Sequence, residues 1–257
     1  MVPSIVYGHG RGANGAIQDN DMVKTADSPN GQSGRRTLAG PSLRWERRAW
    51  EAGKLRVAGV DEAGRGAWAG PLVAAAVIVP ADPRQRARLT RELNRTEAIV
   101  RDSKLLSAEQ RGRVMDVLLT LEVPYSVAVI EVEELDAVGL GVANKLAMCR
   151  AIEQLTPEPE HVLVDAFRLE SLPCTHEPII RGDNTSQAIA MASIVAKLHR
   201  DGLMASLDLE CPEYGFGAHK GYGTSAHRAA IERYGVSRQH RTSFAPIAEL
   251  MARDASV

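Results

Sequence analysis

The stretch that decides the fold is residues 55–79, LRVAGVDEAGRGAWAGPLVAAAVIV. Two dense apolar runs, Leu55–Val60 and Leu72–Val79, stand at its ends, and both contain valine, which favours extended structure. Because the segment between them is rich in glycine, the runs are predicted to be adjacent strands of one sheet. The acidic pair Asp61-Glu62 follows the first run, and neighbouring residues of a regular strand point to opposite faces. We therefore expect the strand to bend, bulge or end at this pair if both carboxylates serve one site.

Further strands and helices follow along the chain. Short apolar runs predict three more strands, at Tyr125–Glu131, His161–Asp165 and Pro178–Ile180. Apolar residues at helical spacing predict helices over residues 43–54, 83–118 with a break at 102–104, 141–155, from about 187 to 209, and 225–234. Asn184, with Gln187 three residues on, is predicted to cap the long helix. Three successive strands, followed by strands that alternate with helices, indicate an α/β fold with a mixed five-stranded sheet flanked by helices.

The composition divides the chain into three parts. Residues 1–42 are rich in Gly, Ser, Asn and Asp and are predicted to be a disordered extension. Residues 43–211 form the predicted catalytic domain, and residues 212–257 form a small C-terminal helical part that binds substrate. The 31 basic and 32 acidic side chains nearly cancel, so a nucleic-acid ligand would have to be held by local patches.

Cysteine usage and hydropathy limit where the protein works. The three cysteines, Cys149, Cys174 and Cys211, lie far apart, which argues against a disulfide framework and a thiolate zinc site. A reducing cytoplasm is therefore expected. The sequence has no apolar run of the roughly 20 residues that a membrane span requires, and no secretory signal, so no membrane association is expected.

Four acidic residues stand at the ends of predicted strands or just beyond: Asp61, Glu62, Asp165 and Asp183. Carboxylates that are distant in sequence but converge in space suit Mg²⁺ or Mn²⁺, two of which can promote phosphodiester cleavage. Each acid has a simpler interpretation. Asp183 could complement the dipole of the helix that follows it, and Asp165 could begin a turn.

Two further segments could contact an anion. The glycines that flank Arg65 in Gly64-Arg65-Gly66 can present backbone N–H groups to a phosphate or sugar, although an ordinary tight turn explains them as well. The spacing matches neither a dinucleotide fingerprint nor a phosphate-binding loop. Residues 219–241 combine basic and aromatic side chains, which suits a nucleic-acid surface or the solvated face of a terminal helix.

From about residue 55 to 247 the chain resembles bacterial ribonuclease HII. Four ordered blocks carry the resemblance: Gly59-Val60-Asp61-Glu62-Ala63-Gly64-Arg65-Gly66 with Ala69-Gly70-Pro71; Asp102-Ser103-Lys104; Arg181-Gly182-Asp183 with Ala192-Ser193-Ile194-Val195-Ala196-Lys197; and Tyr214-Gly215-Phe216 with His219-Lys220-Gly221-Tyr222. Two departures stand beside these blocks. Ala67-Trp68 replaces a proline and an aliphatic residue, and Ala166 stands where glycine is usual.

The resemblance implies a ribonuclease H-like fold and a type 2 ribonuclease H. A monomer is expected, although the sequence itself does not reveal the oligomeric state. Such an enzyme hydrolyses the RNA of RNA–DNA hybrids and cuts 5′ of ribonucleotides embedded in duplex DNA, leaving a 3′-hydroxyl and a 5′-phosphate. It also implies that Asp61, Glu62, Asp165 and Asp183 are catalytic and bind Mg²⁺ or Mn²⁺. The implied substrate-binding residues are Gly64, Arg65, Gly66, Lys104, Lys220 and Tyr222, with Tyr222 against the sugar beyond the cut.

Two alternatives remain beside this interpretation. One is another two-metal nuclease of the same fold, such as ribonuclease HIII, which would be expected to carry a folded N-terminal substrate-binding domain. The other is a hybrid-binding protein without turnover, although such a protein would have no need to crowd carboxylates near phosphates.

Overall fold

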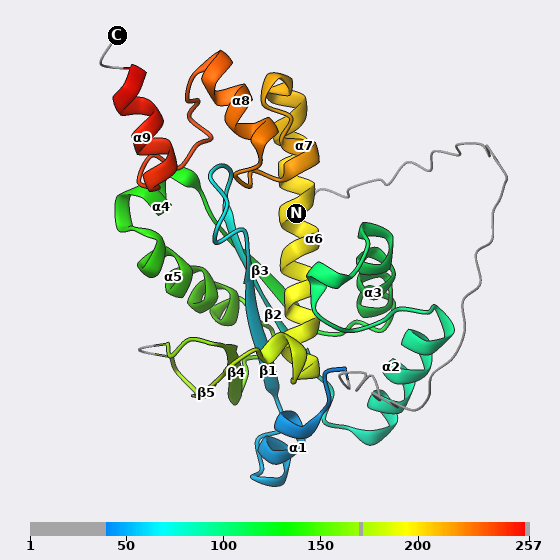
Figure 1. Ribbon diagram of the computed structural model, residues 1–257. Helices are drawn as coiled ribbons and strands as arrows, with labels where there is room; N and C mark the ends of the chain where they lie inside the picture. Colours follow the sequence, from blue (N-terminus) through cyan, green and yellow to red (C-terminus); the bar gives the residue numbers. More distant parts are fainter. Residues whose placement is uncertain (1–39, 170–171, 255–257) are drawn as a thin grey trace, which may run out of the picture. The chain divides into compact units, whose positions relative to one another are not determined.

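The computed structural model describes residues 40–169 and 172–254, and its strands form one mixed sheet. The strand order is β3-β2-β1-β4-β5 (Figure 1); β2 is antiparallel to both β1 and β3, whereas β1, β4 and β5 run parallel to one another. The strands are β1 Val57–Ala63, β2 Leu72–Val79, β3 Tyr125–Ile130, β4 His161–Asp165 and β5 Thr175–Ile179. The predicted mixed five-stranded sheet is confirmed.

The fifth strand differs most from its prediction. It begins at Thr175, three residues before the predicted start at Pro178, and most of its side chains are not buried. Because β5 lies at the edge of the sheet, Pro178 is tolerated there and the apolar pattern that marks an interior strand is missing.

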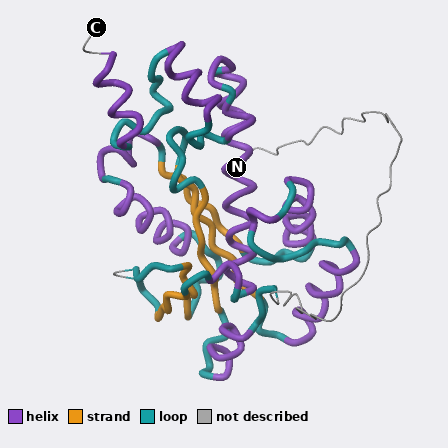
Figure 2. The backbone as a smooth tube through the Cα atoms, viewed as in Figure 1, coloured by secondary structure: helices purple, strands orange, loops and turns teal. Residues whose placement is uncertain are grey.

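Helices flank the sheet, as Figure 2 shows in purple around the orange strands. They are α1 Arg44–Glu51, α2 Pro83–Arg95, α3 Ala108–Thr120, α4 Val132–Val138, α5 Leu140–Glu153, α6 Gln187–Glu210, α7 Phe216–His219, α8 Ser225–Tyr234 and α9 Ala245–Asp254, with 3-10 turns η1 Ser103–Leu105, η2 Gly182–Asn184 and η3 Pro212–Tyr214. The short helix α4 was not predicted, because its acidic sequence lacks an apolar stripe long enough to show a period. Among the described residues, no helix has the length and apolar character needed to cross a bilayer.

The two faces of the sheet carry separate cores. One face packs α6, α2 and α3 against alternate residues such as Ala63, Ala75 and Val77. The other packs α5 against the intervening residues, such as Val60 and Ala74. Side chains that are neighbours along β1 therefore enter different cores.

The start of α6 is fixed by close packing and by a cap. A Cβ on Gly59 would lie 2.3 Å from the main chain of Ala188, so only glycine lets the helix approach β1 this closely. The predicted cap at Asn184 is wrong. The Ser186 side chain accepts from the N–H of Ile189, and Asn184 instead belongs to the turn η2 before the helix.

The segment before β1 is fastened to the same place. Ser42 donates its N–H to the carbonyl of Thr185 and accepts from the N–H of Gln187. The buried carboxylate of Glu46, on α1, accepts from the Ser186 hydroxyl and the Ala188 N–H. Apart from residues 40–42, the predicted disordered extension lies outside the described residues.

The C-terminal part has a small core of its own. Met204, at the far end of α6, packs there with side chains from η3, α7, α8 and α9 that include Phe216 and Ile231. Part of the basic and aromatic cluster predicted at residues 219–241 is inside this core, since His227, His240 and Arg241 are buried. The surface interpretation of that cluster is therefore wrong for these three residues.

Candidate active site

The predicted acids gather where β4 ends beside β1. The antiparallel pairing of β1 with β2 continues in regular register through Asp61 and Glu62 to Ala63. The parallel pairing of β1 with β4 stops at Val60 opposite Val164. Asp165, the last residue of β4, thus lies beside the acidic pair at an open position in the sheet.

The expected break in the strand at Asp61-Glu62 is wrong. The pair lies within a regular strand, and its carboxylates belong to opposite faces of the sheet. Asp61 faces α6, where the Ser193 hydroxyl hydrogen bonds to it and lies 2.9 Å from the Ser103 hydroxyl. Glu62 faces α5, near the amide of Asn144. Because Asp165 ends β4 directly beside this pair, its charge still acts on both carboxylates.

Asp165 and Asp183 are brought together by the turn before α6. The Gly182 N–H donates to Asp165 Oδ1 at 2.7 Å, which fixes the turn against the end of β4. The next residue, Asp183, is buried and accepts from the Asn184 side chain at 2.9 Å. Since Ser186 caps the helix, Asp183 is not its capping residue.

Mutual repulsion and burial disturb the ionisation of these acids. Burial raises the pKa of Asp61 well above its ordinary value, and the charges of Glu62 and Asp165 raise it further. The pKa of Glu62 is raised by burial and by Asp165, against the opposing effect of Arg65. The pKa of Asp165 is also raised, chiefly by burial, with Asp183 adding to the effect. Buried carboxylates that repel one another in this way would be stabilised by positive charge nearby.

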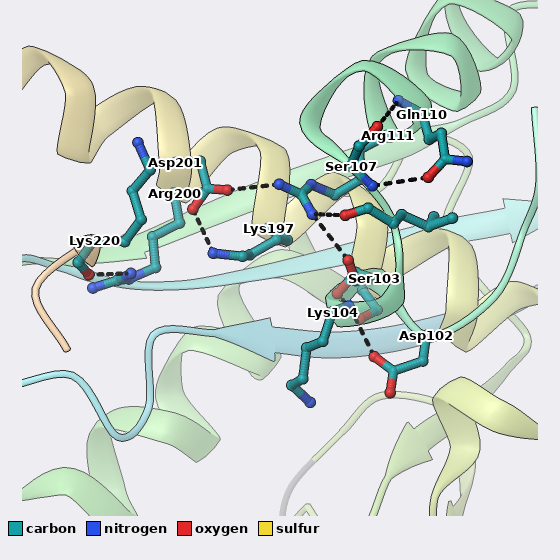
Figure 3. Close-up of polar contacts among 12 residues, drawn as sticks. Asp102, Ser103, Lys104, Ser107, Gln110, Arg111, Lys197, Arg200, Asp201 and Lys220 are labelled. Carbon is teal, nitrogen blue, oxygen red and sulfur yellow. Dashed lines mark hydrogen bonds and ion pairs between the residues drawn. The ribbon is translucent and has the colours of Figure 1, made fainter. Parts of the chain in front are cut away.

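Lys104 supplies part of that charge. Burial would lower its pKa, but Asp102, Asp183 and Asp61 outweigh this effect and raise it. Its loop, at η1, is held by the buried Arg111, whose guanidinium donates to the carbonyls of Ser103 and Leu106 (Figure 3). Arg111 also pairs with Asp201 on α6 at 3.0 Å, and Lys197 pairs with the same carboxylate at 2.6 Å.

The Gly64-Arg65-Gly66 segment forms a turn next to the acids, closed by the Ala67 N–H donating to the Gly64 carbonyl. Gly64 is buried with φ +88°, whereas Arg65 and Gly66 are exposed. The Arg65 guanidinium lies 4.7 Å from the ring centre of Phe167, just after β4, so it faces the acidic end of that strand.

Two other predicted substrate-binding residues, Tyr222 and Lys220, lie in the loop before α8. Tyr222 is 38% exposed, and its ring centre lies 6.0 Å from Lys197 Nζ. Lys220 is fixed through its carbonyl, which accepts from Arg200.

Several residues beside the acids were not predicted from the sequence. Asn144 is an isolated polar residue on the apolar face of its helix, which is a signal that could have been noticed. Ser103 and Ser193 lie inside the recognised blocks but were assigned no role. Farther from the acids, Arg200 was assigned no role and Arg241 was counted in the basic surface cluster, because a buried arginine looks like any surface arginine in a sequence.

The four acids lie close together, but their side chains are not arranged as a metal-ligand shell. Over residues 40–169 and 172–254, no three histidine, cysteine, aspartate or glutamate side chains are arranged to hold a metal ion as they stand. Two carboxylate oxygens are already engaged, since Asp61 Oδ1 accepts from the Glu62 N–H and Asp165 Oδ1 from Gly182. Glu62 Oε2 is buried with no hydrogen-bond partner.

Comparison with known families decides the assignment. Residues 58–247 match the family model described as Ribonuclease HII. The chain belongs to the ribonuclease HII family. It is accordingly a type 2 ribonuclease H, with the endonuclease activity of that class.

Similar proteins of this family come from several bacteria. A ribonuclease HII of Synechococcus sp. is 43% identical over 227 residues, which are 87% of this chain and 96% of that protein. One from Rhodospirillum rubrum is 47% identical over 206 residues, covering 78% of this chain and 88% of the relative. One from Geobacillus kaustophilus is 41% identical over 209 residues, covering 81% and 75%.

Solved structures agree on the fold. The ribonuclease H2 from Pyrococcus horikoshii superposes with a TM-score of 0.64 at 23% identity, covering 79% of this chain and all of that one. A Bst ribonuclease HIII solved in complex with Mn²⁺ gives 0.58 at 21% identity, covering 81% and 73%. The predicted ribonuclease H-like fold is confirmed.

Both departures from the usual ribonuclease HII pattern lie near the site. Ala166 adopts φ +58°, so the chain keeps a left-handed conformation without the glycine that favours it, at a cost of about 1 kcal/mol. Trp68 packs over Gly223, where a Cβ would come within 2.2 Å of its ring, and Arg228 lies 5.3 Å from that ring. Trp68 therefore joins the turn region to α8.

Proposed function

We propose that this enzyme hydrolyses the RNA strand of RNA–DNA hybrids and cuts on the 5′ side of ribonucleotides embedded in duplex DNA. The products would be a 3′-hydroxyl and a 5′-phosphate. Mg²⁺ or Mn²⁺ would be bound by Asp61, Glu62, Asp165 and Asp183. We place this activity in the cytoplasm, in keeping with three cysteines that are all free.

The observation that carries the proposal is the grouping of four carboxylates from three chain segments at the end of β4. Burial and mutual repulsion raise the pKa of Asp61, Glu62 and Asp165, so an added cation would stabilise the group. The buried Glu62 Oε2 without a partner is a free oxygen ligand. An all-oxygen donor set suits Mg²⁺ or Mn²⁺, so the residues fit the ion once their side chains turn toward it.

When bound, divalent cations of this kind acidify an attacking water and stabilise the departing 3′ oxygen. The chain's own residues have separate tasks. The carboxylates hold the ions, and the Ser193 hydroxyl orients Asp61 from one face of the sheet. On the other face, the amide of Asn144 lies near Glu62 without a hydrogen-bond partner of its own. Lys104 offsets the negative charge that develops when a phosphodiester lies among four acids. The turn at Arg65 and Gly66 and the exposed ring of Tyr222 would contact the ribose and the neighbouring sugar.

A hybrid-binding protein without turnover fits less well. Four carboxylates near a phosphodiester repel it, and a protein selected only for binding would gain affinity by losing them. Ribonuclease HIII shares the fold, but the family match and the identities of 41–47% favour ribonuclease HII.

One experiment tests the proposal. DNA duplexes that contain zero, one or four ribonucleotides are incubated with the protein in Mg²⁺ and in Mn²⁺, and the cut positions are mapped. Asp61→Asn is expected to lower cleavage by at least about a thousandfold while duplex binding remains measurable, because the substitution removes one charge from the ligand set. Asp116→Asn, an exposed acid on α3, is the matched control and should cleave normally. Turnover by Asp61→Asn near the control rate, or cuts that ignore the ribonucleotides, would contradict the proposal.

A further inference from the structure

Two arginines, Arg200 on α6 and Arg241 before α9, are the largest fully buried side chains among the described residues, each 0% exposed. Neither forms an ion pair with an acid in the described part of the chain. Asp201 and Asp136 act on them at longer range, but Asp201 pairs with Arg111 and Lys197, and Asp136 accepts from Thr242 and Ser243. Two buried positive charges without counterions are unfavourable unless something else requires them.

Their donors go to main-chain carbonyls, and most of these belong to the loop at residues 65–71. Arg200 donates to the carbonyls of Pro71 at 3.0 Å and Ala69 at 3.2 Å. Arg241 donates to those of Gly70 at 2.9 Å and Arg65 at 3.1 Å. The two side chains therefore fasten the loop from beneath.

This fastening orients the exposed end of the loop. A trans peptide is planar, so its C=O and N–H point in opposite directions. Because the Arg65 carbonyl points inward to Arg241, the N–H of Gly66 points outward. The Gly64 carbonyl points into the turn, where it accepts from the Ala67 N–H, so the N–H of Arg65 also points outward. Neither N–H has an acceptor within residues 40–169 and 172–254.

The guanidiniums also add positive charge beneath these two donors. Burial lowers the pKa of Arg241 to about 9, with the charge of Arg200 adding to the effect, so this guanidinium remains protonated at neutral pH. Burial also lowers the pKa of Arg200, but arginine side chains stay charged in proteins. Adjacent outward N–H groups above buried positive charge form an anion-binding surface. Arg241 Nη2 is buried and has no partner, so its charge is not fully compensated within the described chain.

We propose that Arg200 and Arg241 are positioning residues whose missing counterion is a phosphate of the bound nucleic acid. They hold the loop so that the N–H groups of Arg65 and Gly66 receive that phosphate. This inference rests on the proposed function, and it assigns a role to two residues that do not themselves touch the substrate.

The test compares Arg241→Gln, Arg241→Lys and the natural protein, each ¹⁵N-labelled and free of divalent metal. A duplex with one ribonucleotide is titrated while the Gly66 amide resonance is followed by NMR. In the natural protein the resonance should move downfield on binding. In Arg241→Gln the shift should be lost and the Kd weakened about tenfold, whereas Arg241→Lys, which keeps the charge, should recover much of both.

Arg111→Gln is the matched comparison, since Arg111 is a buried arginine that also fastens a loop but has Asp201 as its acid. It should leave the Gly66 shift intact. If Arg241→Gln binds the duplex as the natural protein does, with the same Gly66 shift, the inference is overturned. That result would leave the proposed function untouched, because cleavage of the mapped duplexes by the natural protein tests it separately. If Arg241→Gln does not fold, Arg241→Lys alone decides. A folded Arg241→Lys that loses both the Gly66 shift and the affinity, although it keeps the positive charge, would refute the role.

Discussion

Two loops border the acidic site, and buried arginines fasten both of them in different ways. The loop around Lys104 is held by Arg111, whose guanidinium forms an ion pair with Asp201. The loop at residues 65–71 is held by Arg200 and Arg241, for which no ion pair occurs in the described chain. In the first arrangement the guanidinium has a carboxylate within ion-pair distance, which it shares with Lys197. The second leaves positive charge uncompensated, as expected of a surface that is completed by a polyanion.

The loops also rest on different supports. Beneath residues 65–71, the Trp68 and Ala69 N–H groups donate to the carbonyl of Gly221, in the same segment as Tyr222. His227 Nδ1 lies 3.0 Å from the Tyr222 carbonyl, and its Nε2 lies 3.1 Å from His240 Nε2. Since His240 Nδ1 accepts from the Ser237 N–H, its Nε2 donates to His227, which in turn donates to Tyr222. Both rings must be neutral for this chain to exist.

Acid should therefore destabilise the loop at residues 65–71 before the loop around Lys104, and this is the largest effect expected. Burial lowers the pKa of His227 and of His240 to about 4. Because the unfolded state takes up protons from pH 6.5 downward and the folded state does not, stability is complete above pH 6.5 and falls as the pH drops toward 4. The loss approaches about 3 kcal/mol for each histidine. Hydrogen exchange at pH 6.5 and pH 4.5 should show protection lost around residues 65–71 and 222 first.

His240→Gln is the control for this prediction, because its side-chain amide can donate to His227 but does not titrate. The pH dependence of its unfolding free energy should be about half as steep over this range. If acid releases the Lys104 loop first, or if the variant keeps the full slope, the histidines are not the support.

A methyl group at Gly64 should have the next largest effect. It would lie 1.8 Å from Nε of the immobile Arg200, on a backbone with φ +88°. Gly64→Ala is expected to cost about 4 kcal/mol, from overpacking and strain together. Gly112→Ala is the matched control on α3, beside Arg111, where nothing lies within 4 Å of the added carbon. It should stabilise the protein by about 0.5–1 kcal/mol. Urea denaturation of both variants measures the difference, and similar costs would remove the claim that Arg200 fixes this loop.

The sequence predicted the acids better than it predicted their supports. Strand ends and motif blocks located Asp61, Glu62, Asp165 and Asp183, because carboxylates after apolar runs are conspicuous. The way in which Asp61 and Glu62 reach one site was predicted wrongly. A sequence shows how each strand alternates, but it does not show that the pairing of β4 with β1 ends at Val60, so that carboxylates on both faces of β1 lie near Asp165.

Burial of charge was equally hidden. Arg241 and His240 were read as part of a basic, aromatic surface, and only the packing of the C-terminal helices puts them inside. The cap at Ser186 was missed for a related reason. Asn184 is a residue type that often caps helices, but here it lies in a turn whose Gly182 donates to Asp165. Asp165 is distant in the sequence, so this contact could not be foreseen.

The smallest of the three effects concerns the loop around Lys104. Asp201→Asn removes the acid shared by Arg111 and Lys197, whose side chains are 9% and 17% exposed, and leaves two cations close together. The cost should be about 2 kcal/mol, less than for a fully buried pair because all three groups retain some contact with water. Since Arg111 carries the Lys104 loop, we also expect kcat for the four-ribonucleotide duplex to fall several-fold while the Gly66 amide still shifts on binding. The converse pattern would be an unchanged kcat with a lost Gly66 shift. It would mean that the two loops are coupled through α6, and that Asp201 is the counterion of its neighbour Arg200, which holds the loop at residues 65–71.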